Sequence, residues 1–417
     1  MLTMRNSLML AFCIAMVWSD LTAANAQDRA SFQTRARVDE KALVSAIPNP
    51  RILAYDLSPD GTRLALFVVS SELVQFPAPS WIVLASAADS KILEKAPFGT
   101  IRQPAQGYAP QVAFTADGKL LIVEDEQQTV SVLDAATLAT VRTIAPDMGS
   151  RFNVPVSIVT AGNSAIVAIS FGTGAPVMNY LDKRPAHTVI VDAANGKQIA
   201  NWDADDIPFS ISPNAEFVAV SDHSVAGPVM GVAILDAKSG KKVVTLSGGY
   251  PSRIGQYPDW KEQFSTRIIA KFINDDEVVL TPDANADQSV SDTAASVKVV
   301  RITGAHVIQE IDPERYGPIG EIAVSTDQST FVAVSRYLAP KYRKHPHWRI
   351  PSDTRPDFLV FSKQEQQMFR LVNRTKLPEL LGLRTRGLFD TAGLRVSRDG
   401  SVISVAEDYG VTVLARK

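Results

Sequence analysis

Between Gln111 and Ile144, four short runs rich in β-branched and apolar residues are separated by turn residues. The first turn, Ala116-Asp117-Gly118, contains an Asp-Gly pair, which supplies the positive φ that a tight hairpin requires. Runs of this length, in which polar and apolar side chains alternate, fit pleated strands that are half buried. The pattern predicts a four-stranded sheet with two partly apolar faces. Such a sheet needs a neighbour on each side, so further copies are expected in the chain.

Similar units occur before and after this one, and two of them have the same Asp-Gly turn after the first strand, in Ser58-Pro59-Asp60-Gly61 and at Asp399-Gly400. The repetition predicts an all-β, seven-bladed β-propeller over residues 51–417. Six blades have four expected strands each: Ile52–Lys95, Gln111–Ile144, Val156–Trp202, Phe209–Leu246, Ile268–Ile311 and Glu321–Val372. The fifth of them lacks the Asp-Gly turn.

The seventh blade has only three expected strands, between Leu394 and Ala415. An unfinished sheet would expose an edge, and a strand from the N-terminal segment 27–50 is the economical cover. We assign Lys41–Ile47 to this closing strand, because it is the apolar run of that segment. Residues 27–40 are polar and mixed in charge, and a loose tail is expected there.

The repeated pattern, Ser-Pro-Asp-Gly followed by strands that end in Val-x-Val-Leu-Asp-Ala-Ala-Thr, resembles the YVTN and WD40-like β-propeller repeats of exported bacterial proteins. The resemblance covers most of residues 51–417 and implies the propeller fold. It leaves function open, because such propellers include scaffolds, lactonases and quinoprotein subunits. The combination of Gly-His with Trp-Asp that is typical of WD40 repeats does not occur in the sequence.

The first 26 residues have the three parts of a secretory signal: Arg5, the apolar run Leu8–Trp18 and the small residues Ala24-Asn25-Ala26. A periplasmic or secreted protein is expected. The apolar run is too short to span a bilayer, so no membrane span is predicted. Cys13 is the single cysteine and lies in this leader, which leaves no disulfide for the mature chain. The net charge of −2 gives no general attraction to nucleic acid.

In a propeller blade, the turns between the first and second strands and between the third and fourth open on one face. The expected turns of this class are short. The other connectors open on the opposite face and include long ones, such as 172–186, 247–267, 281–295, 336–356 and 373–393. Long loops on a rigid scaffold commonly bind ligands, although tolerated surface insertions remain an alternative.

The insertion Tyr337–Arg355 joins basic side chains to aromatic rings, and the next long connector adds more basic residues. This composition suits a protein or another anionic ligand, since guanidinium groups bind carboxylates and stack on rings. A solvated basic loop is the alternative. The candidate binding residues are Tyr337, Lys341, Tyr342, Arg343, Lys344, His345, His347, Trp348, Arg349, Arg355, Arg384 and Arg386.

Metal and catalytic signals are weak. His345 and His347 form an alternating pair without an apparent third ligand, and Asp283, Asp287 and Asp292 lack the regular spacing of a calcium loop. His187, His223 and His306 are expected to be structural. No hydrolase, metalloprotease or nucleotide-binding motif occurs, so no cofactor is expected.

The sequence favours a noncatalytic, monomeric propeller that binds its partner on the long-loop side. Two alternatives stay open: an enzyme of the lactonase kind, whose acid and base groups would converge at the channel mouth, and a quinoprotein-like subunit that needs a partner.

Overall fold

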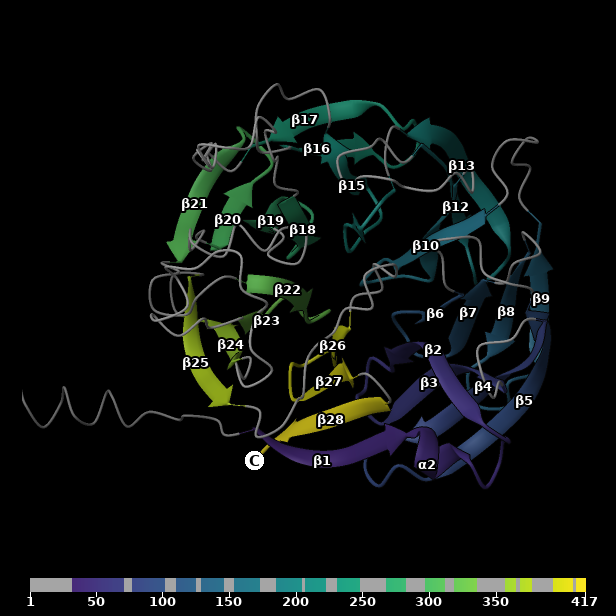
Figure 1. Ribbon diagram of the computed structural model, residues 1–417. Helices are drawn as coiled ribbons and strands as arrows, with labels where there is room; N and C mark the ends of the chain where they lie inside the picture. The colour runs from purple at the N-terminus through teal and green to yellow at the C-terminus, as the bar shows by residue number, and fades with distance from the viewer. Residues whose placement is uncertain are drawn as a thin grey trace, which may run out of the picture.

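The computed structural model places seven four-stranded antiparallel sheets in a ring, with the first strand of each sheet near the centre and the last at the rim (Figure 1). The predicted seven-bladed β-propeller is therefore confirmed. The structure describes residues 32–70, 77–101, 110–124, 129–145, 154–172, 185–204, 207–222, 231–247, 268–282, 297–311, 319–335, 357–364, 368–376, 393–407 and 410–417. Within those ranges, no helix has the length and apolar character needed to cross a membrane.

Each blade runs outward in chain order, and the strand bounds agree closely with the expected ranges. Blade 1 contains β2 (Pro50–Leu57), β3 (Arg63–Ser70), β4 (Ala78–Ser86) and β5 (Ile92–Ile101), and blade 2 contains β6 (Gln111–Phe114), β7 (Leu120–Glu124), β8 (Val130–Asp134) and β9 (Thr140–Ile144). Blade 3 contains β10 (Val154–Thr160), β11 (Ile166–Gly172), β12 (Ala186–Asp192) and β13 (Lys197–Ala204), and blade 4 contains β14 (Ser210–Ile211), β15 (Phe217–Asp222), β16 (Gly231–Asp236) and β17 (Lys242–Leu246).

The same order holds in the second half of the ring. Blade 5 contains β18 (Ile268–Phe272), β19 (Glu277–Pro282), β20 (Val297–Arg301) and β21 (His306–Ile311), and blade 6 contains β22 (Ile319–Val324), β23 (Thr330–Ser335), β24 (Asp357–Lys363) and β25 (Phe369–Lys376). Blade 7 contains β26 (Leu394–Val396), β27 (Val402–Glu407), β28 (Gly410–Arg416) and, as its outermost strand, β1 (Phe32–Asp39).

The N-terminal strand closes the ring, but the segment assigned to it was wrong. β1 pairs with β28 from Phe32 opposite Arg416 to Asp39 opposite Gly410. Lys41–Ile47 is instead a turn that begins with the short helix α2 (Glu40–Leu43), capped by Asp39, whose Oδ1 accepts from Ala42 N at 3.0 Å. Leu43 and Ile47 of this turn pack into the core under blade 1, whereas Val44 is exposed. An outermost strand needs few apolar residues, since much of it faces solvent, which is why the polar sequence of β1 resembled a tail.

The first turn of a blade is held by its own side chains. In blade 1, Asp60 Oδ1 accepts from Ser58 Oγ at 2.6 Å and from Thr62 N at 3.0 Å, and Gly61 has a φ of 69°. A Cβ at Gly61 would lie 2.8 Å from Val402 of blade 7. Glycine is therefore required twice, for the backbone conformation and for the close approach of the preceding blade.

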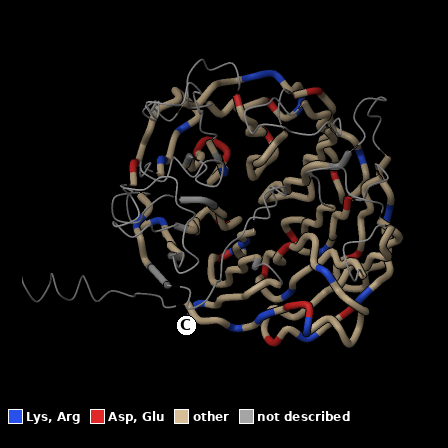
Figure 2. Tube along the Cα trace, in the orientation of Figure 1, with Lys and Arg blue, Asp and Glu red and all other residues tan. Residues whose placement is uncertain are grey.

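The hydrophobic core lies in the seams between neighbouring blades. Leu121 and Val123 of β7 pack with blade 1, whereas Ile122 between them packs with blade 3. Each central strand thus fills two seams, which is why these strands are apolar on both sides. Charged positions of both signs are distributed around the ring (Figure 2).

The two faces of the ring carry connectors of different length. Every connector between first and second strands, and between third and fourth strands of blades 1–6, has four or five residues. We call their side the short-turn face. The opposite side, the long-loop face, carries some short connectors, such as 408–409, and all the long ones: 173–185, 247–267, 283–296, 336–356 and 377–393.

Candidate binding face and polar clusters

All twelve candidate binding residues, in 337–355 and at Arg384 and Arg386, lie outside the described residues, so their contacts stay a prediction. The structure does place the roots of the two segments. Asp357 pairs with Ser335 on one side and with Lys376 on the other. The insertion and the following connector therefore leave the long-loop face from three adjacent strands of blade 6.

The hairpin that carries the insertion rests on a well-packed aromatic group. Phe331 of β23 stacks on Phe361 of β24 with ring centroids 4.6 Å apart, and Phe369 of β25 lies 4.9 Å from Phe331. All three rings are buried. Gln309 of blade 5 donates to Phe369 O at 2.6 Å and accepts from Phe369 N at 2.9 Å. The support of the insertion is thus fixed both within blade 6 and against blade 5.

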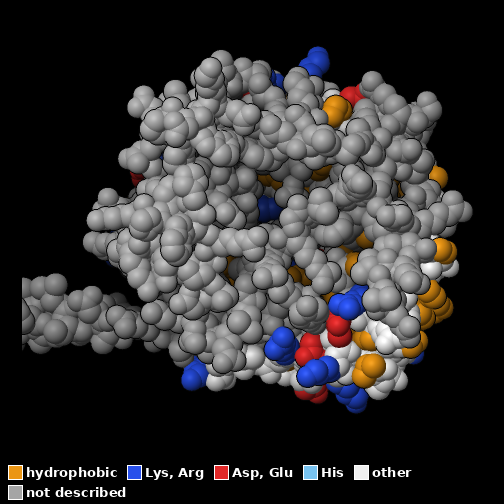
Figure 3. All heavy atoms as spheres, in the orientation of Figure 1, with side chains coloured by type: hydrophobic (Ala, Val, Ile, Leu, Met, Phe, Trp, Pro, Cys, Tyr) orange, Lys and Arg blue, Asp and Glu red, His pale blue; other side chains and the backbone are white. Residues whose placement is uncertain are grey.

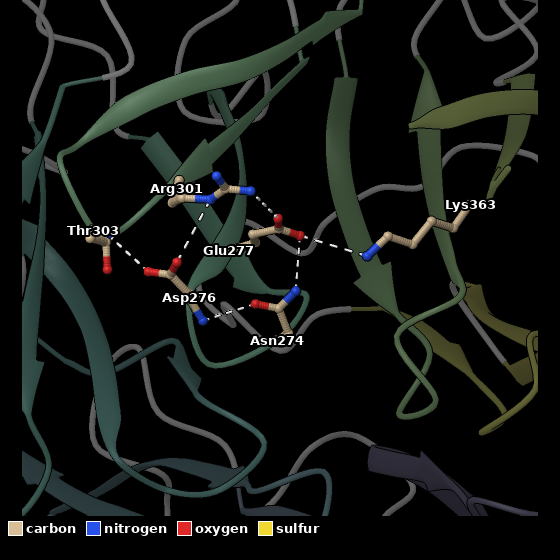
Figure 4. Close-up of polar contacts among 6 residues, drawn as sticks. All are labelled: Asn274, Asp276, Glu277, Arg301, Thr303 and Lys363. Carbon is tan, nitrogen blue, oxygen red and sulfur yellow. Dashed lines mark hydrogen bonds and ion pairs between the residues drawn. The ribbon is translucent and has the colours of Figure 1, made fainter. Parts of the chain in front are cut away.

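A polar cluster joins blades 5 and 6 at the short-turn end of the same hairpin (Figure 4). Glu277 Oε1 lies 3.2 Å from Arg301 Nη2, and Glu277 Oε2 lies 3.7 Å from Lys363 Nζ. Asn274 Nδ2 donates to Oε2 at 2.9 Å. The Glu277 side chain is 7% exposed, against 42% for Arg301 and 22% for Lys363.

Three side chains contact the Glu277 carboxylate in Figure 4: Asn274 and Arg301 come from the same blade, and Lys363 comes from the next one. A carboxylate surrounded in this way bridges two blades. The matching position of blade 1 is Arg63, which donates to Gly118 O and Ala135 O of blade 2. Glu277 and Arg63 are thus two versions of one inter-blade contact. The second strand begins with an apolar residue in blades 2, 3, 4 and 7, but with a charged residue, Arg63 or Glu277, in blades 1 and 5. This difference was the sequence signal of the contact, and it was missed.

The inner strands form a second polar cluster, centred on Asp56 of β2. Asp56 Oδ1 accepts from Arg395 Nε of blade 7 at 2.8 Å, and Oδ2 accepts from Phe114 N of blade 2 at 2.8 Å. The Arg395 guanidinium lies over the Tyr55 ring, 5.6 Å from its centroid, and Tyr55 Oη donates to Gly393 O. One carboxylate therefore joins three blades.

Burial raises the pKa of Asp56, against the opposing effect of the Arg395 charge and the hydrogen bond from Phe114. An enzyme of the lactonase kind would need several acid or base groups near one another at the channel. Among the inner-strand side chains that the structure describes, Asp56 is the one carboxylate, and the side chain of Glu321 in β22 lies outside that set. No second carboxylate from that part of the channel wall joins it.

The histidines that were expected to be structural occupy different positions. His187 of β12 lies opposite Asp203 of β13, with Nδ1 2.7 Å from Asp203 Oδ1. His306 begins β21 and is exposed, and His223 lies outside the described residues. In the part of the chain that the structure describes, no three His, Cys, Asp or Glu side chains come together as a metal site would require. His345, His347, Asp283, Asp287 and Asp292 all lie outside it.

The chain matches no family model, and no curated protein matches it. Function is therefore inferred from the residues of the chain itself.

Proposed function

We propose that the protein is an exported, noncatalytic propeller of the YVTN or WD40-like kind, which binds a protein or another polyanionic ligand through its long-loop face. The observation that carries this proposal is the difference between the faces. The short-turn face keeps connectors of four or five residues in six blades, whereas blade 6 alone sends out the segments 336–356 and 377–393 from adjacent strands on the other face. Their basic and aromatic composition supplies the chemistry for anions.

The test compares two sets of four substitutions that change the net charge equally. The first set replaces Lys341, Arg343, Lys344 and Arg349 by Ser in the insertion. The control set replaces four exposed lysines of the short-turn face by Ser: Lys119, Lys197, Lys238 and Lys241. The probe is polyglutamate on a biosensor, with association and dissociation rates measured at increasing salt.

The insertion set is expected to slow association, with the difference from wild type shrinking as salt approaches 1 M, where the Debye length is about 3 Å. The control set should leave the rates near wild type. Trp348→Ala should instead speed dissociation, at a cost of roughly 2 kcal/mol that depends little on salt, if the ring is a buried anchor. If the insertion set and the control set change the rates equally, only the net charge matters, and a site on the insertion is refuted.

A further inference from the structure

The outermost strand of every blade contains a β-bulge at the same position of the repeat, and the outermost strand of blade 1 has a second one, at Phe98. In blade 2, Val132 pairs with Arg142 and Leu133 pairs with Thr140, so Val141 is left without a partner on β8. The same step in register occurs where each of the other third strands pairs with its outer neighbour. The skipped residues are Arg35, Leu93, Val141, Ile199, Val243, Ile308 and Val372.

The outermost strand is the one that is irregular in every blade, whereas the pairing of first with second strands shifts register only in blades 1, 3 and 6. The pairing between the second and third strands is regular in all seven blades. The skipped residues are not glycines, and they include an arginine besides aliphatic residues, so residue type does not explain the irregularity. What they share is a place on the last strand, whose outer side is the open edge of the sheet.

The open edges have the composition of strands that associate. β9 reads Thr-Val-Arg-Thr-Ile and β17 reads Lys-Val-Val-Thr-Leu. Val141 is 46% exposed and Val243 is 52% exposed. Hydrophobic side chains are visible along the edge of the molecule over β5 and β9 (Figure 3). Exposed edge strands rich in β-branched residues are templates for pairing with another chain.

A bulge interrupts such a template, because the extra residue breaks the regular spacing of N–H and C=O groups and increases the local twist. β9 and β17 have five residues each, and the bulge falls on the second. Only three residues then follow in regular register. That length is too short for a stable added strand, since isolated strand pairs are marginal even when longer.

We propose that the seven bulges close the rim of the propeller to strand addition by a second copy of this chain. The local twist at a bulge also directs residues of the outermost strand onto the next blade. Trp202 of β13 in blade 3, for example, lies against Gly240 of blade 4 and donates from Nε1 to Ala237 O at 3.0 Å. A role limited to this packing is the competing explanation. The two roles differ in what happens when a bulge is removed.

The experiment removes one residue from the full chain, Val141 in one variant and Val243 in another. Either deletion restores a regular ladder without changing the remaining pairs of its hairpin. The matched controls are Val141→Thr and Val243→Thr, which keep the bulge and remove the apolar side chain. Molecular mass is measured by sedimentation as a function of protein concentration, and melting is followed in parallel.

Either deletion is expected to tighten self-association by about tenfold or more, which corresponds to one or two added hydrogen bonds, while the threonine controls behave as wild type. Deletion variants that fold and keep the wild-type dependence of mass on concentration would overturn the proposal. Failure of both deletions to fold would overturn it as well, because the bulges would then serve the packing of the ring.

Discussion

The contact between blades 5 and 6 allows a quantitative test in which two substitutions compensate each other. Glu277→Leu places at the start of β19 the residue type that blade 2 has at the same point, Leu120. It removes the buried acceptor of Lys363 and Arg301. Lys363→Met removes one donor and leaves Glu277 with Arg301 and Asn274.

The magnitudes follow from the exposure of the partners. Breaking a fully buried ion pair costs about 3–5 kcal/mol. Because Arg301 is 42% exposed and Lys363 is 22% exposed, solvent takes over part of their charge, and we expect Glu277→Leu to cost about 1–2 kcal/mol. Lys363→Met should cost about 0.5–1 kcal/mol. The double variant should be more stable than Glu277→Leu alone, because an apolar pair then fills the seam.

Urea unfolding of the wild type, both single variants and the double variant gives the coupling free energy, which we expect to be about 1 kcal/mol and to fall at high salt. Lys197→Met, which changes an exposed lysine of blade 3, is the control and should add to Glu277→Leu without coupling. Additivity of Glu277→Leu and Lys363→Met within about 0.3–0.5 kcal/mol would refute the inter-blade contact as an energetic link.

Three further predictions concern stability. Deleting residues 27–39 should expose the edge of β28 and cause a large loss of melting temperature with aggregation, whereas an unchanged melting temperature would exclude closure by β1. Gly61→Ala should cost about 2–4 kcal/mol of stability, because Gly61 has a positive φ and a Cβ there would contact Val402. Gly99 has a φ of 127°, but a Cβ there would have nothing within 4 Å, so Gly99→Ala should cost less. Equal urea midpoints of the two variants would contradict this prediction. At Asp60, Asp117 and Asp399, burial alone would raise the pKa, but hydrogen bonds in the turn outweigh it and lower the pKa. Their contribution to stability is therefore present above the ordinary carboxyl pKa of about 4 and is lost as pH falls through the lower folded value, so the urea midpoint of Asp60→Asn should depend less on pH in that range than that of wild type.

The parts of the fold that could be predicted from the sequence depend on local signals. A short polar turn, which is Asp-Gly in blades 1, 2 and 7, and the apolar strand that follows it lie within a few residues of one another in each blade. The blade order then follows from the chain order. Even blade 5, whose turn contains Asn274 and Asp276 in place of Asp-Gly, could be placed, because its strands remain β-branched.

Other features depend on contacts between distant residues. β1 pairs with a strand at the other end of the chain, and its polar sequence carries little signal of its own. The partners of Asp56 are Phe114 and Arg395, in two different blades, so no local spacing announces the cluster. The bulge at Val141 requires no special residue type, and the order of polar and apolar residues in β9 is that of an ordinary strand. The basic insertion was recognisable by composition alone, and its contacts lie outside the described residues.

Closure by the first and last strands also determines when the fold can be completed. Each blade from the first to the sixth is built from strands close in sequence, so its internal contacts have low contact order and can form early. The pairing of Phe32 with Arg416 has the greatest sequence separation of the strand pairs in the described residues, so we expect it to form last. During synthesis, β1 is made before the other strands that the structure describes and has no partner until β28 is made. A chain that stops before β28 cannot close its ring, so truncated products keep an open edge that proteases and chaperones can recognise.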